Sequence, residues 1–261
     1  MNRMRKLLDE LASGKISVDE AEKQLKGLSL DSVGELALID VNRGARSGVP
    51  EIVFGASKDV GDIAQIVRSM LNTQDVALVT RLTQEKLDIL LSNFKDIEIE
   101  TFGKSPILTA LVYNKSWTMP KTGGRIAIIT AGTSDIPYAK EAEALTKLMG
   151  VEVLSYYDVG VSGLHRLIEP IKDIIEKDVD ALIVFAGMEG ALPTVVAALV
   201  DIPVIGVPVP TGYGFGGMGE TALASMLQSC SPGLAVVNIG NGLGAASVAS
   251  LIAKKAAKYR S

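Results

Sequence analysis

Hydrophobic and polar positions alternate in a regular strand and helix rhythm over the second half of the chain. Apolar runs of strand length are each followed by a segment whose apolar residues have helical spacing. The strands are predicted at 125–131, 151–156, 180–186, 203–207 and 234–239, and the helices at 136–149, 163–177, 190–200, 219–229 and 242–258. Near-continuous apolar strands separated by helices predict a parallel sheet that is covered on both faces.

Five such strand and helix units predict a doubly wound, flavodoxin-like α/β fold with the strand order 2-1-3-4-5. In that order the chain reverses direction between strands 1 and 3, so a crevice opens at their carboxyl ends. The loops after these two strands are therefore the first places to look for a binding site.

The first 115 residues have a less regular pattern. Apolar residues recur at helical spacing over 3–13, and Ser17 with Glu20 forms a capping box that predicts a second helix. The segment 35–54 is predicted to be extended, and two helices and three short strands are expected after it. This order favours a helical hairpin and a small α+β domain, which divides the chain into residues 1–120 and 121–261.

Composition and charge narrow the class of function. The 261 residues are 48% hydrophobic and 21% charged, which is enough for a packed core. The formal net charge is -4 with acids and bases interspersed, and this balance argues against a nucleic-acid partner. The most apolar stretch, 195–210, is interrupted by Asp201, Pro203 and Pro208, so neither a membrane segment nor a membrane partner is predicted. No secretory signal is predicted, and the cytoplasm is the expected location.

Candidate ligand contacts follow the first and third predicted strands. Thr133, Ser134 and Asp135 come directly after strand 1, where free backbone N–H groups at a helix start attract an anion. Ordinary helix capping is the alternative. The candidates after strand 3 are Gly187, Met188 and Glu189. Glycine lets a ligand approach the backbone closely, although Glu189 would also favour the positive end of a helix.

The loop after strand 2 contains Asp158 and, further on, His165, the only histidine in the chain. The positive end of a helix favours the neutral imidazole, which can act as a base. An exposed surface histidine without a chemical role is the alternative.

The loops after strands 4 and 5 are rich in glycine. The loop after strand 4 contains Gly214, Gly216 and Gly217 among aromatic residues, which predicts a mobile lid or a phosphate cradle. After strand 5, Asn241 and Gly242 suggest a dinucleotide fingerprint, but they belong to the last unit of the chain. We interpret them as a close backbone contact with an additional phosphate contact.

Cys230, the only cysteine, comes at the end of the predicted helix 219–229. No intrachain disulfide is therefore possible. The negative end of a helix does not favour a thiolate, and an inert core residue is one interpretation. A cationic ligand above the sulfur would favour the thiolate and hence a nucleophile.

Several motifs resemble the carboxyaminoimidazole ribonucleotide mutase family of purine synthesis. They are GTSD at 132–135, LHR at 164–166, FAGMEGALPTVVAALVDIPVIGVPV at 185–209 and NIGNGLGAA at 238–246. The resemblance implies that Ser134 and Asp135 meet a ribonucleotide and that His165 moves protons during CO2 transfer. Two differences stand out. That family has a histidine before Leu-Pro where Gly190-Ala191 stand here, and it lacks the N-terminal hundred residues.

Over nearly its full length the chain resembles the LarB family, the pyridinium-3,5-biscarboxylic acid mononucleotide synthases of nickel-pincer cofactor synthesis. The motifs are DVNRGARSGVPEIVFG at 40–55, GMEG at 187–190, GYGFGGMGE at 212–220 and LQSCSPG at 227–233. The resemblance implies carboxylation of the pyridinium ring of nicotinate adenine dinucleotide at C5 and hydrolysis of its phosphoanhydride, which releases AMP.

The same resemblance implies roles for individual residues and partners. Cys230 would be the nucleophile, and Glu189 an acid/base group or a carboxylate near the phosphates. Asp158, His165 and Glu189 are candidates for the base that takes the C5 proton. CO2 or bicarbonate would be the co-substrate, Mg²⁺ a candidate ion, and the assembly a homo-octamer without a tightly bound cofactor. The purine mutase activity and a non-catalytic nucleotide-sensing module are the alternatives.

Overall fold

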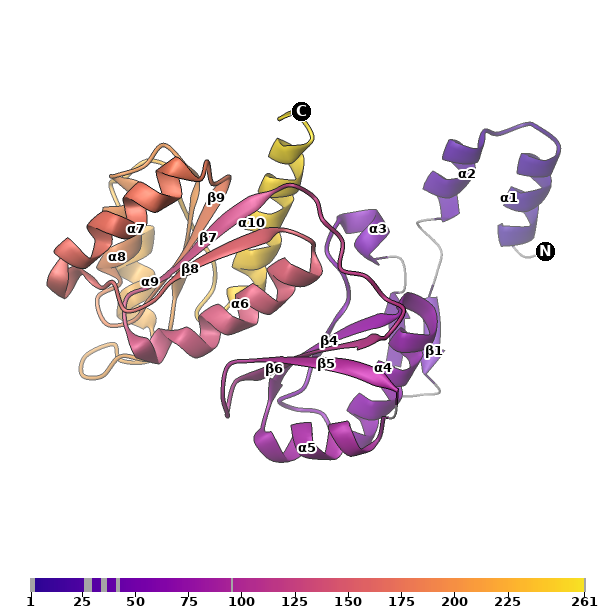
Figure 1. The fold of residues 1–261 in the computed structure, drawn as a ribbon, viewed down its shortest axis with the longest axis horizontal. Coiled ribbons are helices and arrows are strands. Elements are labelled where there is room, and N and C mark those ends of the chain that lie inside the picture. Colours follow the sequence, from indigo (N-terminus) through magenta and orange to yellow (C-terminus); the bar gives the residue numbers. More distant parts are fainter. Residues whose placement is uncertain (1–2, 26–29, 34–36, 41–42, 95, 261) are drawn as a thin grey trace.

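Helix α6 (Ile136–Leu148) lies between two β-sheets, one from each half of the chain (Figure 1). The computed structural model describes residues 3–25, 30–33, 37–40, 43–94 and 96–260. All but five of the thirteen residues of α6 are buried and one of the five is Pro137 near its start, so this helix presents buried positions in more than one direction. It therefore belongs to the hydrophobic cores of both sheets.

The C-terminal sheet has five parallel strands in the order β11-β10-β9-β7-β8. The strands are β7 (Arg125–Thr130), β8 (Glu152–Tyr156), β9 (Ala181–Ala186), β10 (Val204–Pro208) and β11 (Leu234–Val236). Counted from β7, this order is 2-1-3-4-5, so the predicted doubly wound α/β fold is confirmed. The central strand β9 is buried along its whole length, as its apolar sequence indicates.

Helices cover both faces of this sheet. One face packs on α6 and α10 (Gly242–Ala257), with Ile128, Ile183 and Val207 among the buried sheet residues. The other face packs on α7 (His165–Glu176), α8 (Ala191–Ala197) and α9 (Glu220–Leu227). The alternating side-chain directions of the strands supply an apolar residue to each face in turn.

The N-terminal half forms a four-stranded sheet in the order β3-β4-β6-β5. Its strands are β3 (Ile52–Phe54), β4 (Val76–Leu82), β5 (Ile97–Phe102) and β6 (Leu108–Asn114), and only β3 and β4 are parallel. One face packs on α4 (Val60–Gln74) and α5 (Gln84–Ser92). On the other face, Leu78 and Leu111 enter the same core as α6. The α+β class is confirmed, while the division at residues 120 and 121 stays a prediction.

The segments before this sheet differ in part from expectation. Helices α1 (Arg3–Ala12) and α2 (Val18–Leu25) form a hairpin that stands apart from both sheets in Figure 1. The Glu20 N–H donates to Ser17 Oγ at 3.1 Å and the Ser17 N–H to the Glu20 carboxylate at 3.2 Å, so the capping box is confirmed. Strands β1 (Leu30–Val33) and β2 (Ala37–Asp40) follow as an antiparallel pair.

The prediction that 35–54 is extended throughout was wrong at α3 (Arg43–Ser47). This short helix ends at Gly48, whose φ of 78° is in the left-handed region that stops helices. Ser47 Oγ donates to the Arg43 carbonyl at 2.8 Å and so stabilises the single turn. A helix of five residues is too short to show the apolar spacing by which a helix is recognised in a sequence.

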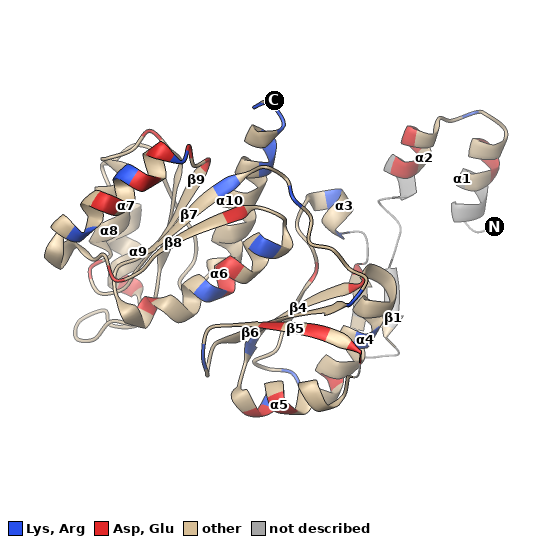
Figure 2. Ribbon diagram, viewed as in Figure 1, with Lys and Arg blue, Asp and Glu red and all other residues tan. Residues whose placement is uncertain are grey.

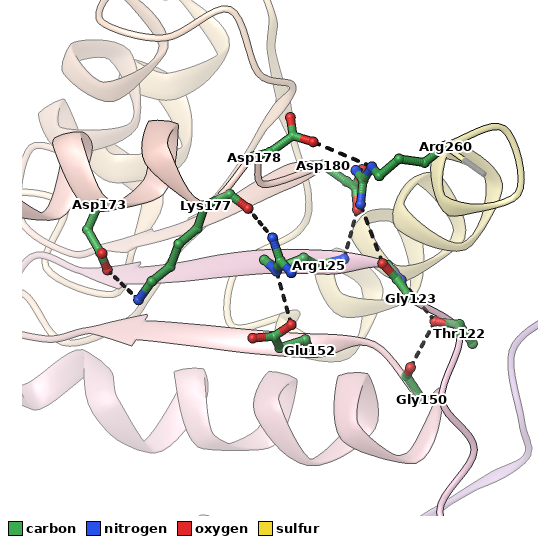
Figure 3. Close-up of polar contacts among 11 residues, drawn as sticks. Thr122, Gly123, Arg125, Gly150, Glu152, Asp173, Lys177, Asp178, Asp180 and Arg260 are labelled. Atoms are coloured by element: carbon green, nitrogen blue, oxygen red, sulfur yellow. Dashed lines mark hydrogen bonds and ion pairs between the residues drawn. The ribbon is translucent and has the colours of Figure 1, made fainter.

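A polar network fixes the amino ends of the C-terminal strands (Figure 3). The Arg125 N–H donates to Asp180 at 2.7 Å, Arg125 Nε to Glu152 at 3.0 Å, and Arg260 pairs with the buried Asp180. Elsewhere Figure 2 shows acidic and basic residues interspersed along α6 and α7. Every helix within the described residues is too short or too polar to cross a membrane. The carboxyl ends of the strands lie at the opposite edge and carry the loops considered next.

Candidate functional site

A cavity of about 430 Å³ opens at the carboxyl ends of the C-terminal strands. Loops after β7, β8, β9 and β10 contribute to it, as expected for the switch point of a doubly wound sheet. Its lining residues are Ala131, Gly132, Ser134, Asp135, Gly160, Val161, Ser162, Ala186, Gly187, Met188, Glu189, Ala191, Leu192, Thr211 and Tyr213. The structure therefore brings five of the predicted contacts together here: Ser134, Asp135, Gly187, Met188 and Glu189.

Asp135 is the buried charged group of this cavity, with 3% of its surface exposed. It ends the short 3-10 helix η1 (Thr133–Asp135), and both carboxylate oxygens have donors. Thr211 Oγ1 donates to one at 2.7 Å, and the Gly132 N–H donates to the other at 2.9 Å. Burial raises the pKa of Asp135, and the two hydrogen bonds act in the opposite direction. The result is a fixed carboxyl group that can hold a proton or accept one from a ligand.

The turn after β9 depends on glycine and on left-handed backbone. A Cβ atom at Gly187 would lie 2.4 Å from Thr211 Oγ1, so a side chain there would displace the partner of Asp135. Met188 has φ 49° and Gly190 has φ 65°, and the Gly190 N–H donates to the Gly187 carbonyl at 2.9 Å. A non-glycine residue in this region is uncommon and concentrates at functional turns. The tight turn sets Glu189 on the wall of the cavity.

The loop after β8 supplies backbone and a hydroxyl, not the two predicted acid/base groups. Gly160, just before the 3-10 helix η2 (Val161–Gly163), and Ser162, within it, line the cavity. Asp158 lies outside the lining and pairs with Arg166 at 3.1 Å. His165 is exposed at the start of α7, also outside the lining. Of the three candidate bases, Glu189 alone lies on the cavity wall.

The glycine-rich loop after β10 begins inside the cavity and then leaves it. Thr211 and Tyr213 line the cavity, whereas Gly214, Gly216 and Gly217 do not. Gly214 and Gly216 both have φ 73°, which favours glycine, and the intervening Phe215 is fully exposed. An exposed aromatic on such a loop is available for a ligand or for a second copy.

Asn241 and Gly242 also lie outside the lining. Asn241 Oδ1 accepts from the Gly244 N–H at 2.8 Å and so caps α10. A Cβ atom at Gly242 would lie 2.7 Å from the Tyr138 carbonyl oxygen. This contact accords with the interpretation as close backbone packing, and the phosphate contact stays a prediction.

Cys230 is exposed and outside the cavity lining, between α9 and β11. Its neighbours are bonded to α8: Thr194 Oγ1 donates to Ser229 Oγ at 2.9 Å, and Ser231 Oγ donates to the Thr194 carbonyl at 2.9 Å. Ala191 and Leu192, in the first turn of the same helix, line the cavity. Exposure excludes the inert core residue, and α8 connects the cysteine segment with the cavity.

Sequence reasoning missed Thr211 and Ser162, and it noted Tyr213 only as one of the aromatics of its loop. It also included the exposed Thr133, which is outside the lining. The sequence signal for Thr211, Ser162 and Tyr213 was their position, because each belongs to a loop after a parallel strand. Within the described residues no group of three or more His, Cys, Asp and Glu side chains could hold a metal ion.

Comparisons with known proteins agree with this architecture. Residues 125–260 match the AIR carboxylase family, and residues 30–109 match the LarB/PurE-like N-terminal domain. An uncharacterized protein of Methanocaldococcus jannaschii is 46% identical over 254 residues, which are 96% of this chain and 97% of that protein.

Two N5-carboxyaminoimidazole ribonucleotide mutases are similar over a smaller part. That of M. jannaschii is 36% identical over 44% of this chain and 68% of its own length. That of Thermotoga maritima is 32% identical over 52% of this chain and 83% of its own length.

Proposed function

Because this chain belongs to the LarB branch of the AIR carboxylase family, whose relatives include enzymes, we propose that it is a pyridinium carboxylase and hydrolase. Its substrate would be nicotinate adenine dinucleotide, carboxylated at C5 of the pyridinium ring by CO2 or bicarbonate. Hydrolysis of the phosphoanhydride would then give the biscarboxylated mononucleotide and AMP.

One observation carries this proposal: an exposed cysteine stands on a segment bonded to the helix that lines the cavity. The cavity wall carries the carboxylate of Glu189 as well. Cys230 follows the carboxyl end of α9, where the helix dipole disfavours a thiolate. A bound pyridinium ring would bring the positive charge that favours it.

In the proposed carboxylation, the Cys230 thiolate adds to C4 of the pyridinium ring, and the ring nitrogen takes up the displaced electron pair. The product is a neutral dihydropyridine whose C5 is an enamine carbon, and C5 attacks CO2. A base then removes the C5 proton, and the nitrogen lone pair expels the thiolate from C4. Aromaticity is restored, and a carboxylate has replaced one proton. Covalent addition thus divides one prohibitive step into feasible ones.

We assign the base role to Glu189, because Asp158 is paired with Arg166 and His165 lies outside the cavity lining. Asp135, Ser134 and the first turn of α6 would orient the ribose and phosphates. Mg²⁺ would be held mainly by the phosphates, with one carboxylate at most, and would assist attack of water on the anhydride phosphorus.

The site would be completed by association of several copies, and we propose a homo-octamer. The outer face of α7 and the residue before it expose Leu164, Ile168 and Ile175, which are more than half exposed in one chain. Apolar residues gathered on one face of a helix favour a protein partner. In the proposed assembly the exposed Cys230 of one copy would face the cavity of another.

The first test is mass spectrometry of products after incubation with nicotinate adenine dinucleotide, ¹³C-bicarbonate and Mg²⁺. We expect AMP and a biscarboxylated mononucleotide carrying one ¹³C. Cys230→Ala should abolish carboxylation while its melting temperature stays near that of the wild type, because an exposed side chain contributes little to stability. Carboxylation by the Ala variant would refute the covalent mechanism. Tight dinucleotide binding with no product from the wild type would indicate a sensing module instead.

A second candidate is carboxyaminoimidazole ribonucleotide mutase activity. It is favoured by the presence of Ser134 and Asp135 in the cavity and by the similarity to named mutases. Gly190 and Ala191 stand where that family has a histidine, which counts against it. Turnover of carboxyaminoimidazole ribonucleotide at an enzymatic rate, unaffected by Cys230→Ala, would establish this alternative.

A further inference from the structure

Arg81 of the N-terminal sheet makes a contact with a carboxyl-end loop of the C-terminal sheet. It stands in β4 where the pairing with β6 shifts register between Val79 and Leu82. Its φ of 55° is in the left-handed region, where a bulky residue is rarely found. A bulge of this kind bends a strand and redirects a side chain. Arg81 consequently points out of its own sheet and toward α6.

The guanidinium meets one buried carboxylate and one backbone carbonyl. Its Nε lies 3.2 Å and its Nη2 3.3 Å from the two oxygens of Glu141, whose side chain is 0% exposed. Nη2 also donates to the Gly240 carbonyl at 2.7 Å. The ring of Phe54 lies 5.4 Å from Cζ and restricts the side chain further. Burial raises the pKa of Glu141, and the hydrogen bonds and positive charge of Arg81 act in the opposite direction.

Gly240 belongs to the loop between β11 and α10, which contacts the cavity's supporting elements. The Gly240 N–H donates to the Pro208 carbonyl at the end of β10 at 2.8 Å. A Cβ atom at Gly240 would lie 3.2 Å from the Tyr138 ring, on the first turns of α6. A Cβ atom at Gly219, the base of the glycine-rich loop, would lie 2.8 Å from Ile239. Residues 238–241 are thus packed between the starts of α6 and α9.

We infer that Arg81 is a positioning residue, through which the N-terminal domain holds the loop 238–241 and, with it, the starts of α6 and α9 beside the cavity. The inference rests on the proposed function for its effect on catalysis, but the positioning itself does not. It gives the N-terminal domain a defined part in the reaction: the domain fixes the loop that carries Asn241 without touching the cavity.

The chain offers a matched control at the same junction. Lys147 of α6 pairs with Glu100 of β5 at 2.7 Å, which also joins the two halves but does not contact the loop. The test compares Arg81→Met with Lys147→Met. A double variant, Arg81→Met with Glu141→Gln, removes the buried charge that the single variant would leave unpaired.

Hydrogen exchange of the segment 238–244 is the first readout, because it needs no activity. We expect exchange at least about tenfold faster in Arg81→Met and unchanged exchange in Lys147→Met. The double variant should regain melting temperature while the loop still exchanges fast. Two results would overturn the inference. One is unchanged loop exchange in Arg81→Met. The other is a double variant in which slow loop exchange returns together with the melting temperature.

Steady-state kinetics with nicotinate adenine dinucleotide is the second readout. We expect KM to rise between about tenfold and a hundredfold in Arg81→Met and in the double variant, with a smaller change in kcat. Unchanged kinetics alongside faster loop exchange would overturn the link to catalysis. Absence of turnover in the wild type would instead refute the proposed function, and loop exchange would still decide the positioning.

Discussion

Burial and hydrogen bonding act in opposite directions on the Asp135 carboxyl. Desolvation is the larger effect and raises its pKa, while Thr211 and Gly132 stabilise the charged form. The native protein therefore keeps the Asp135 proton to a higher pH than the unfolded chain, in which an aspartate has a pKa of about 3.9. Stability from this residue is present below that value and is lost as pH rises through the folded pKa.

Asp135→Asn should remove this pH dependence. The amide can accept from the Gly132 N–H and donate to Thr211, so both local hydrogen bonds can be kept. We expect the melting temperature of the variant, relative to the wild type, to increase as pH rises from 4 to 7. Asp201→Asn changes the charge by the same amount on an exposed residue and serves as the control. A constant difference across this range would contradict the dominance of burial.

Among the elements around the cavity, α8 begins at a close backbone contact with α9. Gly190 precedes the helix with φ 65°, and a Cβ atom there would lie 2.7 Å from the Ala222 carbonyl oxygen of α9. That backbone cannot move without shifting α9. The close approach keeps Ala191 and Leu192 on the cavity wall.

Gly190→Ala should therefore reduce the free energy of unfolding by more than backbone strain alone would. Gly233→Ala is the matched control, because Gly233 has φ 86° and nothing within 4 Å of a Cβ position. We expect the control to lose about 1–2 kcal/mol of unfolding free energy and Gly190→Ala to lose about 1–3 kcal/mol more. Chemical denaturation measures the unfolding free energy of both variants. Equal losses would show that α9 accommodates the added methyl group without further destabilisation.

The elements also show what the sequence could and could not predict. Regular apolar runs were enough for five parallel strands and their order, because buried parallel strands leave a strong pattern. The loops after strands 1 and 3 were therefore expected to form a crevice, and Asp135 and Glu189 of these two loops line the cavity. The bulge at Arg81 had no signal, since VALVTRL reads as an unbroken strand and arginine is not favoured at positive φ. Nor could spacing reveal that Thr211 bonds to Asp135, a contact 76 positions away in the chain.

In the whole molecule, helices and sheets form successive packed layers. Helices α7, α8 and α9 cover one face of the C-terminal sheet, and α10 covers the other face beside α6. Helix α6 lies between the two sheets, and α4 and α5 cover the far side of the N-terminal sheet. The N-terminal sheet is thus part of the same packed structure. The surface that the layers leave outside includes both Cys230 and the mouth of the cavity, which favours a site shared between copies.

Mixed assemblies test that arrangement. Cys230→Ala and Glu189→Gln should each abolish carboxylation alone, since one lacks the nucleophile and the other the base. If one copy supplies the thiol and another the cavity, assemblies containing both variants will have some sites with both wild-type groups. We therefore expect carboxylation to return when differently tagged variants are co-expressed and purified through both tags. Light scattering should give eight times the 27.5 kDa of one chain. Mixed assemblies of that mass without activity would place Cys230 and Glu189 in the same copy.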